Sequence, residues 1–236
     1  MRTQKTLLSW SSGKDSAWAL HTLQANPSIE VAGLLTTLNE SAERVAMHGV
    51  RRELLRAQGR AAGLPVIEID LPEGCTDEQY QERMGTALQR AKADGVEAIA
   101  YGDLFLEDVR DYRIKLMQGT DLEPLFPIWG QPTRDLSRRM TTAGLSAILS
   151  CVDPAQLDPS FVGRTYDAAL LADLPEGVDP CGENGEFHTF VTAGPMFTDA
   201  IEVATGESVL RGGFQFIDIL PAAAADLGIA NGEVPA

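Results

Sequence analysis

The chain is poor in cysteine, in histidine and in long apolar runs, and each shortage excludes a class of protein. Its 236 residues include 3 cysteines and 3 histidines. Cys75, Cys151 and Cys181 are widely spaced and form no C-x-x-C pair, which argues against a zinc site and against a disulfide framework. No apolar run reaches the length that crosses a bilayer. The cysteines are therefore interpreted as buried or incidental thiols.

Positive charge is also scarce. The chain has 19 Lys and Arg against 34 Asp and Glu, for a formal net charge of −15. Such an acidic surface repels a phosphate backbone, so nucleic acid is not an expected partner unless a local basic patch exists. Residues 1–5 lead directly into the first apolar run and leave no room for a signal peptide. We therefore expect a cytoplasmic protein with no membrane partner.

The first 150 residues or so alternate short apolar runs with helical patterns, which is typical of a parallel sheet covered by helices on both faces. The expected strands are 6–10, 31–36, 66–70, 98–101, 122–126 and 147–152. The expected helices are 16–24, 42–62, 106–117, 133–143, and one that begins at Thr76 and ends near Gly95. Thr76 and Gln79 have the spacing of a capping box.

The pattern changes after Asp153-Pro154, where prolines and glycines become frequent. One helical segment, 165–174, is followed by β patterns at 187–191, 201–203, 208–210 and 214–219, with Thr205-Gly206 expected as a turn. The sequence thus predicts two domains. Residues 1–152 form a doubly wound, mostly parallel α/β domain, and residues 153–236 form a smaller mixed α+β domain.

The most informative segment follows the first expected strand: Ser11, Ser12, Gly13, Lys14, Asp15 and Ser16. A strand, a tight turn of small residues and a helix start make an anion cradle, because backbone N–H groups, the helix dipole and a lysine converge. The segment is not a Walker A loop, which needs an earlier glycine and a Ser or Thr after the lysine. A solvated turn with an exposed lysine is the alternative.

Further polar residues follow other strands of the expected parallel sheet, namely Thr37, Gly102 and Asp103. The carboxyl ends of parallel strands gather at one edge of the sheet, and ligands bind there where the strand order reverses. Glu107 and Arg110 follow on one face of the next helix. Carboxylates at a helix start also suit the helix dipole, and this alternative stays open.

A third polar cluster occupies residues 181–190 and includes Glu183, Asn184, Gly185, Glu186 and His188. If a strand runs from Glu186, then Glu186 and His188 lie on the same face of it. Such a cluster favours a binding site, and a solvent-facing strand edge is the alternative interpretation.

These motifs carry a resemblance. The loop at 11–16 resembles the SGGKDS loop of the PP-loop (N-type) ATP pyrophosphatases, with Ser12 where glycine is commoner. Together with 102–110 and 182–189, it is similar to the diphthine–ammonia ligase (diphthamide synthetase) branch of that superfamily, whose first domain is adenine nucleotide alpha hydrolase-like.

The resemblance implies how the site residues divide. Nucleotide binding is expected at Ser11, Ser12, Gly13, Lys14, Asp15, Ser16, Thr37, His48 and Gly102, with Lys14 and Asp103 as catalytic residues. Acceptor binding is expected at Glu107, Arg110, Glu183, Asn184, Gly185, Glu186 and His188. His48 also fits a helical surface histidine, and that interpretation stays open.

The family chemistry is ATP-dependent formation of an amide. The resemblance implies that an acceptor carboxylate is adenylated, that pyrophosphate leaves, and that ammonia then displaces AMP. Mg²⁺ is expected with the triphosphate as counter-charge, and the sequence does not identify its ligands, for which Asp15 and Asp103 are candidates only. The sequence shows no recognisable glutaminase domain, so free ammonium is the expected nitrogen source. The implied acceptor is diphthine, a modified histidine on translation elongation factor 2. The alternatives are an ATP pyrophosphatase acting on another acceptor, such as a bacterial small molecule or tRNA, and a non-catalytic ATP-binding module.

Overall fold

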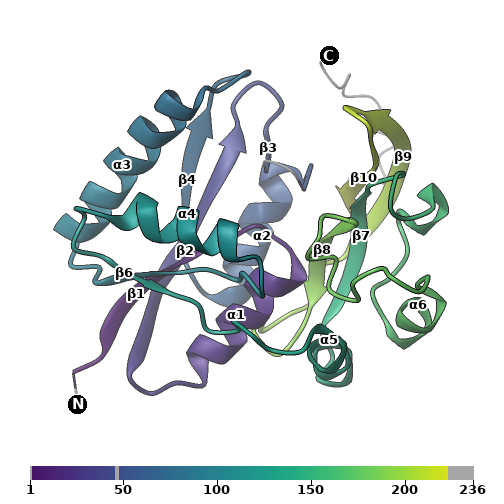
Figure 1. Cartoon of the computed structure of the whole chain (residues 1–236), viewed down its shortest axis with the longest axis horizontal. Coiled ribbons are helices and arrows are strands. Elements are labelled where there is room, and N and C mark those ends of the chain that lie inside the picture. The colour runs from purple at the N-terminus through teal and green to yellow at the C-terminus, as the bar shows by residue number, and fades with distance from the viewer. Residues whose placement is uncertain (1, 46–47, 223–236) are drawn as a thin grey trace.

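Two β-sheets organise the chain, and helices lie between them and outside them (Figure 1). The computed structural model describes residues 2–45 and 48–222. The first sheet contains β1 (Gln4–Ser9), β2 (Ile29–Asn39), β3 (Arg44–Val45), β4 (Val66–Leu71), β5 (Ala98–Ala100) and β6 (Glu123–Leu125). The second contains β7 (Ser146–Val152), β8 (Phe187–Ala193), β9 (Val203–Arg211) and β10 (Phe214–Pro221).

The first sheet is the expected mostly parallel one. β1 pairs in parallel with β2 on one side and with β5 on the other, β4 extends the β2 side, and β6 extends the β5 side. Short β3 is antiparallel to β2. The chain runs from β1 towards β2 and β4, then returns across the sheet to β5, so the strand order reverses between β1 and β5. This reversal marks the edge where ligands bind in such sheets.

Helices cover both faces of the first sheet, as the alternation of apolar residues requires. α1 (Lys14–Gln24) and α2 (Arg52–Ala62) lie on one face, and α3 (Asp77–Ala93) and α4 (Glu107–Met117) lie on the other (Figure 1). Neighbouring strand residues point to opposite faces. Leu8 therefore packs in a cluster with Leu20 of α1, whereas Leu7 packs in another with Leu88 of α3. The capping box at Thr76 is confirmed.

The second sheet is antiparallel, with the strand order β8-β7-β10-β9. Its associated helices are α5 (Thr133–Thr142), α6 (Ala168–Asp173) and the short 3-10 helix η1 (Pro159–Phe161). α1 and α2 lie between the two sheets (Figure 1). Leu8, Leu20, Leu149 and Phe190 belong to one buried cluster, so the two sheets share a hydrophobic core. No helix in the described part of the chain is long and apolar enough to cross a membrane.

The strand expected at 147–152 does not belong to the parallel sheet. It forms β7, which pairs antiparallel with β8 and β10 of the second sheet. The change of sheet therefore falls between β6 and β7. The division into domains 1–152 and 153–236 stays a prediction, and its end lies outside the described residues.

Two local expectations were also wrong. The expected turn Thr205-Gly206 lies inside β9, and the hairpin to β10 turns at Gly212-Gly213, where φ is +56° and +88°. Two consecutive positive φ values suit a two-residue hairpin that twists with its strands, and glycine adopts them without a steric penalty. The helix expected at 42–62 begins only at Arg52, because Arg44 and Val45 pair with β2.

Candidate active site

A cleft of about 630 Å³ opens at the carboxyl ends of β1, β2 and β5. This is the size of a typical small-molecule site. Eleven of the predicted site residues line it: Ser11, Lys14, Asp15, Ser16, Thr37, His48, Gly102, Asp103, Glu183, Gly185 and His188. The two halves of the chain thus meet at one cavity, as the motifs predict.

The loop at 11–16 joins β1 to the N-terminus of α1 and is compact. Ser16 Oγ donates to the Gly13 carbonyl oxygen at 2.9 Å, and Ser11 Oγ lies 3.2 Å from Ser16 Oγ. Ser12 is fully buried with φ at +71°, a left-handed conformation that favours glycine. This explains physically why glycine would fit better at this position. The backbone of Gly102 lies against the loop at Asp15. A Cβ added at Gly102 would lie 2.9 Å from the Asp15 carbonyl carbon, so only glycine fits this close approach.

The second sheet holds this loop through hydrogen bonds to the loop's backbone. The Lys14 amide donates to Thr189 Oγ1 at 3.0 Å, and the Val191 amide donates to the Ser12 carbonyl oxygen at 3.0 Å. Both partners belong to β8. The loop is therefore not a solvated turn, and its shape depends on a strand more than 170 residues further along the chain.

Gln58 of α2 holds the loop at 11–16, a role that the sequence analysis missed. Its side chain is fully buried and contacts Trp10 after β1, the loop and β8. The Trp10 indole donates to Gln58 Oε1 at 2.9 Å, and Gln58 Nε2 donates to the carbonyl oxygens of Ser12 at 3.0 Å and Val191 at 2.8 Å. No local pattern marks one glutamine of a helix as buried, so only the long-range contacts identify it.

Lys14 lies at the floor of the cleft with 2% of its surface exposed. Its Nζ donates to Asp15 Oδ2 at 2.8 Å and to the Cys181 carbonyl oxygen, and it lies 5.3 Å from the centre of the Phe187 ring and 5.7 Å from that of Tyr166. Burial is the largest single influence and acts to lower the pKa of Lys14, but Asp15, Cys181 and Glu183 together outweigh it, and the pKa is raised. Lys14 is thus a fixed, buried cation.

Glu183 connects the second half of the chain to the exit of β5. Its Oε1 accepts a hydrogen bond from the Leu104 amide at 2.8 Å. Burial, together with the charge of Asp15, raises the pKa of the Glu183 carboxyl to about 7. A carboxyl that titrates near neutrality can accept or donate a proton at physiological pH.

His48 and His188 meet across the cleft, with ring centroids 4.7 Å apart. His48 Nδ1 lies 3.1 Å from the Thr189 carbonyl oxygen, so this nitrogen carries the proton. Burial and the proximity of His188 lower the pKa of His48 to about 3, and burial and the charge of Lys14 lower that of His188 to about 4. Both rings are neutral at pH 7. His48 lies in the turn after β3, not on a helix.

Six predicted site residues do not line the cleft. Ser12 and Gly13 lie within the loop, and Glu107 is exposed at the start of α4. Arg110 lies over the rings of Phe126 and Trp129, at 5.4 and 4.7 Å from their centres.

The other two, Glu186 and Asn184, organise their own segment. Glu186 is 2% exposed and accepts hydrogen bonds from the amides of Asp179 at 2.9 Å and Asn184 at 3.0 Å, and from Asn184 Nδ2 at 3.0 Å. β8 begins only at Phe187, after Glu186. Their expected role in acceptor binding stays a prediction.

Two buried carboxylate oxygens at the cleft lack a hydrogen-bond partner, Asp15 Oδ1 and Asp103 Oδ2. Asp103 Oδ2 lies 3.5 Å from Arg113 Nε, at ion-pair distance. Burial raises the pKa of both carboxyls. Within residues 2–45 and 48–222, no group of three or more His, Cys, Asp or Glu side chains is arranged to hold a metal ion.

Two family models match this chain. The diphthamide synthase N-terminal domain matches residues 4–118, and the diphthamide synthase C-terminal domain matches residues 132–223. Together they include the loop at 11–16 and the segment at 182–189, which we call the two walls of the cleft. The chain belongs to the diphthamide synthase family.

Several curated relatives of this chain are named diphthine–ammonia ligase. The chain is 32% identical over 153 residues to the diphthine–ammonia ligase of Homo sapiens and 29% identical over 153 residues to that of Rattus norvegicus. Each alignment covers 62% of this chain and 56% of the relative, so the chain spans about half the length of these relatives. The diphthine–ammonia ligase of Danio rerio is 27% identical over 222 residues, which covers 85% of this chain and 87% of the relative.

Proposed function

We propose that this protein is an ATP-dependent ligase that adenylates an acceptor carboxylate and transfers ammonia to it, with release of AMP and pyrophosphate. The observation that carries the proposal is the shared cleft, in which the loop at 11–16 faces Glu183 and His188 of the other half. Relatives named diphthine–ammonia ligase support it.

The first step is an attack on ATP. An oxygen of the acceptor carboxylate bonds to the α-phosphorus, the bond from the α-phosphorus to the bridging oxygen breaks, and pyrophosphate leaves. Negative charge grows on the pyrophosphate. The N-terminus of α1 and the buried charge of Lys14 stabilise that charge, because both are fixed before the reaction begins.

The second step forms the amide. The nitrogen of ammonia bonds to the acyl carbon, the bond from that carbon to the AMP oxygen breaks, and AMP leaves with the electron pair. One proton must leave the nitrogen. Glu183 is the group at the cleft that we assign to accept it, because its pKa of about 7 suits proton transfer near neutrality.

The cleft fits Mg²⁺ held mainly by the nucleotide. Asp15 Oδ1 and Asp103 Oδ2 are carboxylate oxygens without a hydrogen-bond partner, and Mg²⁺ commonly takes one or two carboxylates besides phosphate and water. When bound, the ion supplies counter-charge to the triphosphate. Asp15 and Asp103 are the residues that would hold it.

For the acceptor we propose a diphthine-like carboxylate on an elongation factor, with free ammonium as the nitrogen source. The name of the relatives favours this acceptor over a small molecule or tRNA, and the net charge of −15 disfavours RNA.

The nucleotide products test the proposal. The protein is incubated with ATP, Mg²⁺ and cell extract, with and without ¹⁵N-ammonium, and the products are separated by chromatography. We expect AMP and pyrophosphate in equal amounts, and label in one acceptor. ADP and orthophosphate as products would contradict the proposal, and ATP binding without any turnover would favour a binding module. Label in a small molecule would contradict the acceptor alone.

A further inference from the structure

We propose that Gln58 is the positioning residue of the loop at 11–16. Its side-chain amide holds the left-handed turn at Ser12 and ties that turn to the second sheet. The proposal rests on the proposed function for the identity of the ligand, ATP, but the geometry of Gln58 stands by itself.

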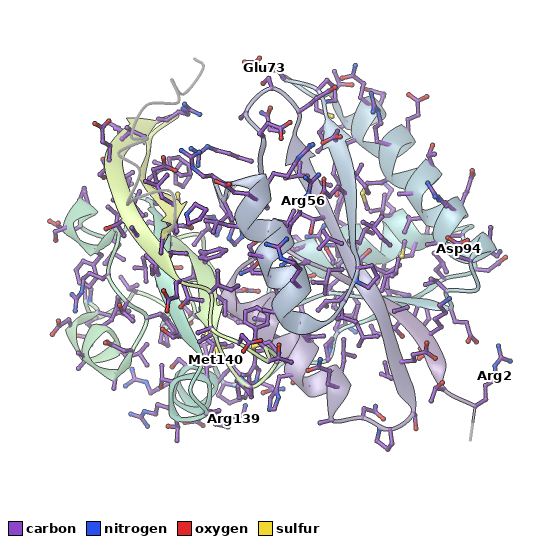
Figure 2. All side chains as sticks on the ribbon, turned by 180° about the vertical axis from the view of Figure 1, so that it is seen from behind. Arg2, Arg56, Glu73, Asp94, Arg139 and Met140 are labelled. Carbon is purple, nitrogen blue, oxygen red and sulfur yellow. The ribbon has the colours of Figure 1, made fainter. Side chains whose placement is uncertain are left out.

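The side chain of Gln58 has a fixed orientation. Its oxygen faces a donor, the Trp10 indole, and its nitrogen faces two acceptors, the carbonyl oxygens of Ser12 and Val191. Both amide N–H groups and the oxygen are therefore used. Figure 2 shows the molecule from behind, with Arg56 on the outer surface of α2. Gln58 is on the same helix but is fully buried.

Packing alone does not require an amide at this position. A buried amide is unfavourable unless it is hydrogen-bonded, and an apolar side chain of similar size would fill the same space at less risk. The amide is useful because it accepts from the Trp10 indole and donates to two carbonyl groups, one of which belongs to the residue with the unfavourable φ. Gln58 therefore does more than fill the core.

Ser12 needs external support because its φ of +71° is unfavourable for a residue with a Cβ. Its carbonyl oxygen is held by two donors, the Val191 amide at 3.0 Å and Gln58 Nε2 at 3.0 Å. These bonds fix the oxygen against α2 and β8. A carbonyl oxygen released towards the cleft would repel a phosphate, and the loop would no longer present its N–H groups to an anion.

The first experiment compares ATP affinity in Gln58→Leu and wild type. The probe is α,β-methylene-ATP, which cannot release pyrophosphate, and its Kd is measured by calorimetry. We expect the Kd of Gln58→Leu to rise roughly tenfold, since a buried hydrogen bond to a strained loop is lost. The matched control is Leu55→Ala, a fully buried residue of the same helix outside the hydrogen-bonded group. It should lower Tm and leave the Kd unchanged.

The second experiment is a rescue that a purely structural role would not give. A glycine in place of Ser12 would adopt the positive φ without a penalty, so Ser12→Gly should return the Kd of Gln58→Leu to within about threefold of wild type. Ser12→Gly in the Leu55→Ala background measures the effect of the glycine on the Kd while Gln58 is present, and the gain in the Gln58→Leu background must exceed that effect. If Gln58→Leu does not fold, Gln58→Met takes its place, because the unbranched side chain fits the same volume.

The outcomes separate the two proposals. Wild-type protein that does not bind the analogue would overturn the proposed function and this inference with it. Wild-type protein that binds it, with Gln58→Leu binding equally well, would overturn only the role of Gln58. A weakened Gln58→Leu that Ser12→Gly does not rescue would also overturn that role, because the loss would then have another cause.

Discussion

The two walls of the cleft are held in opposite ways. The loop at 11–16 depends on partners from elsewhere in the chain, namely Gln58, Thr189 and Val191. The segment at 182–189 is organised by its own Glu186, whose carboxylate accepts hydrogen bonds from Asn184 and from nearby Asp179. A mutation of the loop's partners should therefore disturb ATP binding at a distance, whereas a mutation of Glu186 should act locally.

The difference shows that two charged residues of one motif can have different surroundings. Glu183 and Glu186 are three residues apart in one polar segment, yet Glu183 lines the cleft and Glu186 is buried away from it. Lys14 shows the mixed case, since it lines the cleft and is also held by protein groups on several sides.

The largest effect is expected at Lys14, which belongs to the loop at 11–16 and contacts Cys181 and Phe187 of the other half of the chain. Lys14→Met should lower the rate of AMP formation about 10²- to 10³-fold, because a preorganised charge at the leaving group is lost. It should also lower the free energy of unfolding by about 3 kcal/mol, because Asp15 loses its partner in a buried ion pair. Chromatography of AMP and urea unfolding measure the two effects.

The control for Lys14 is Lys92→Met. Lys92 pairs with Asp121 at the surface, where the change should cost less than about 1 kcal/mol and leave the rate unaltered. Equal rates in Lys14→Met and Lys92→Met would remove Lys14 from the chemistry.

A smaller effect is expected at His188, whose ring packs against His48, and it should appear in the pH dependence of stability. The unfolded chain protonates His188 at its ordinary pKa of 6.5, but the folded state does so only at about 4. The folded state binds fewer protons in this range, so the stabilising contribution is present above pH 6.5 and is lost as the pH falls towards 4. His188→Gln should remove roughly 2 kcal/mol of this pH dependence, allowing for partial exposure.

Urea unfolding between pH 4 and 8 measures this dependence. Glu183 acts in the opposite sense, because its raised pKa adds stability as the pH falls from about 7 towards 4.5. The difference between wild type and His188→Gln cancels that contribution. His21→Gln is the control on α1, and an equal change in both variants would contradict the assignment to His188.

The smallest effect is expected at Glu186. Glu186→Gln keeps the shape of the side chain but replaces one acceptor oxygen by a donor, which faces the Asn184 or Asp179 amide. The free energy of unfolding should fall by about 1–2 kcal/mol, with the Kd of the ATP analogue unchanged. Glu207→Gln on exposed β9 should change neither. A weakened Kd in Glu186→Gln would show that the two walls are not held independently.

The sequence predicted local features better than long-range pairing. The Thr76 capping box and most strand positions were correct because they depend on neighbouring residues. The partners of β7 were wrong, because a short apolar run fits a buried parallel strand and a central antiparallel strand equally well. The turn predicted at Thr205-Gly206 was wrong. Gly212-Gly213 is an equally plausible turn sequence, and only the register of β9 and β10 separates the two.

The site shows the same limit. The loop and Glu183 could be found because glycine, lysine and carboxylates stand out in a motif. Gln58 could not be found, because an amide is common on helices and its importance comes from carbonyl groups more than 40 residues away. The role of Glu186 in acceptor binding stays a prediction. The hydrogen bonds from the Asp179 and Asn184 amides to its carboxylate could not be foreseen, because a sequence does not show whether a carboxylate faces solvent or its own backbone.

The position of β7 has a consequence during synthesis on the ribosome. When residue 152 has been made, β7 exists without β8 and β10, which are its neighbours on both sides. Both of its edges then expose unpaired N–H and C=O groups, a hazard for aggregation in nascent chains. Translation must continue through β10, which ends at Pro221, before β7 is flanked on both sides. The loop at 11–16 is hydrogen-bonded to β8, so it is also completed late.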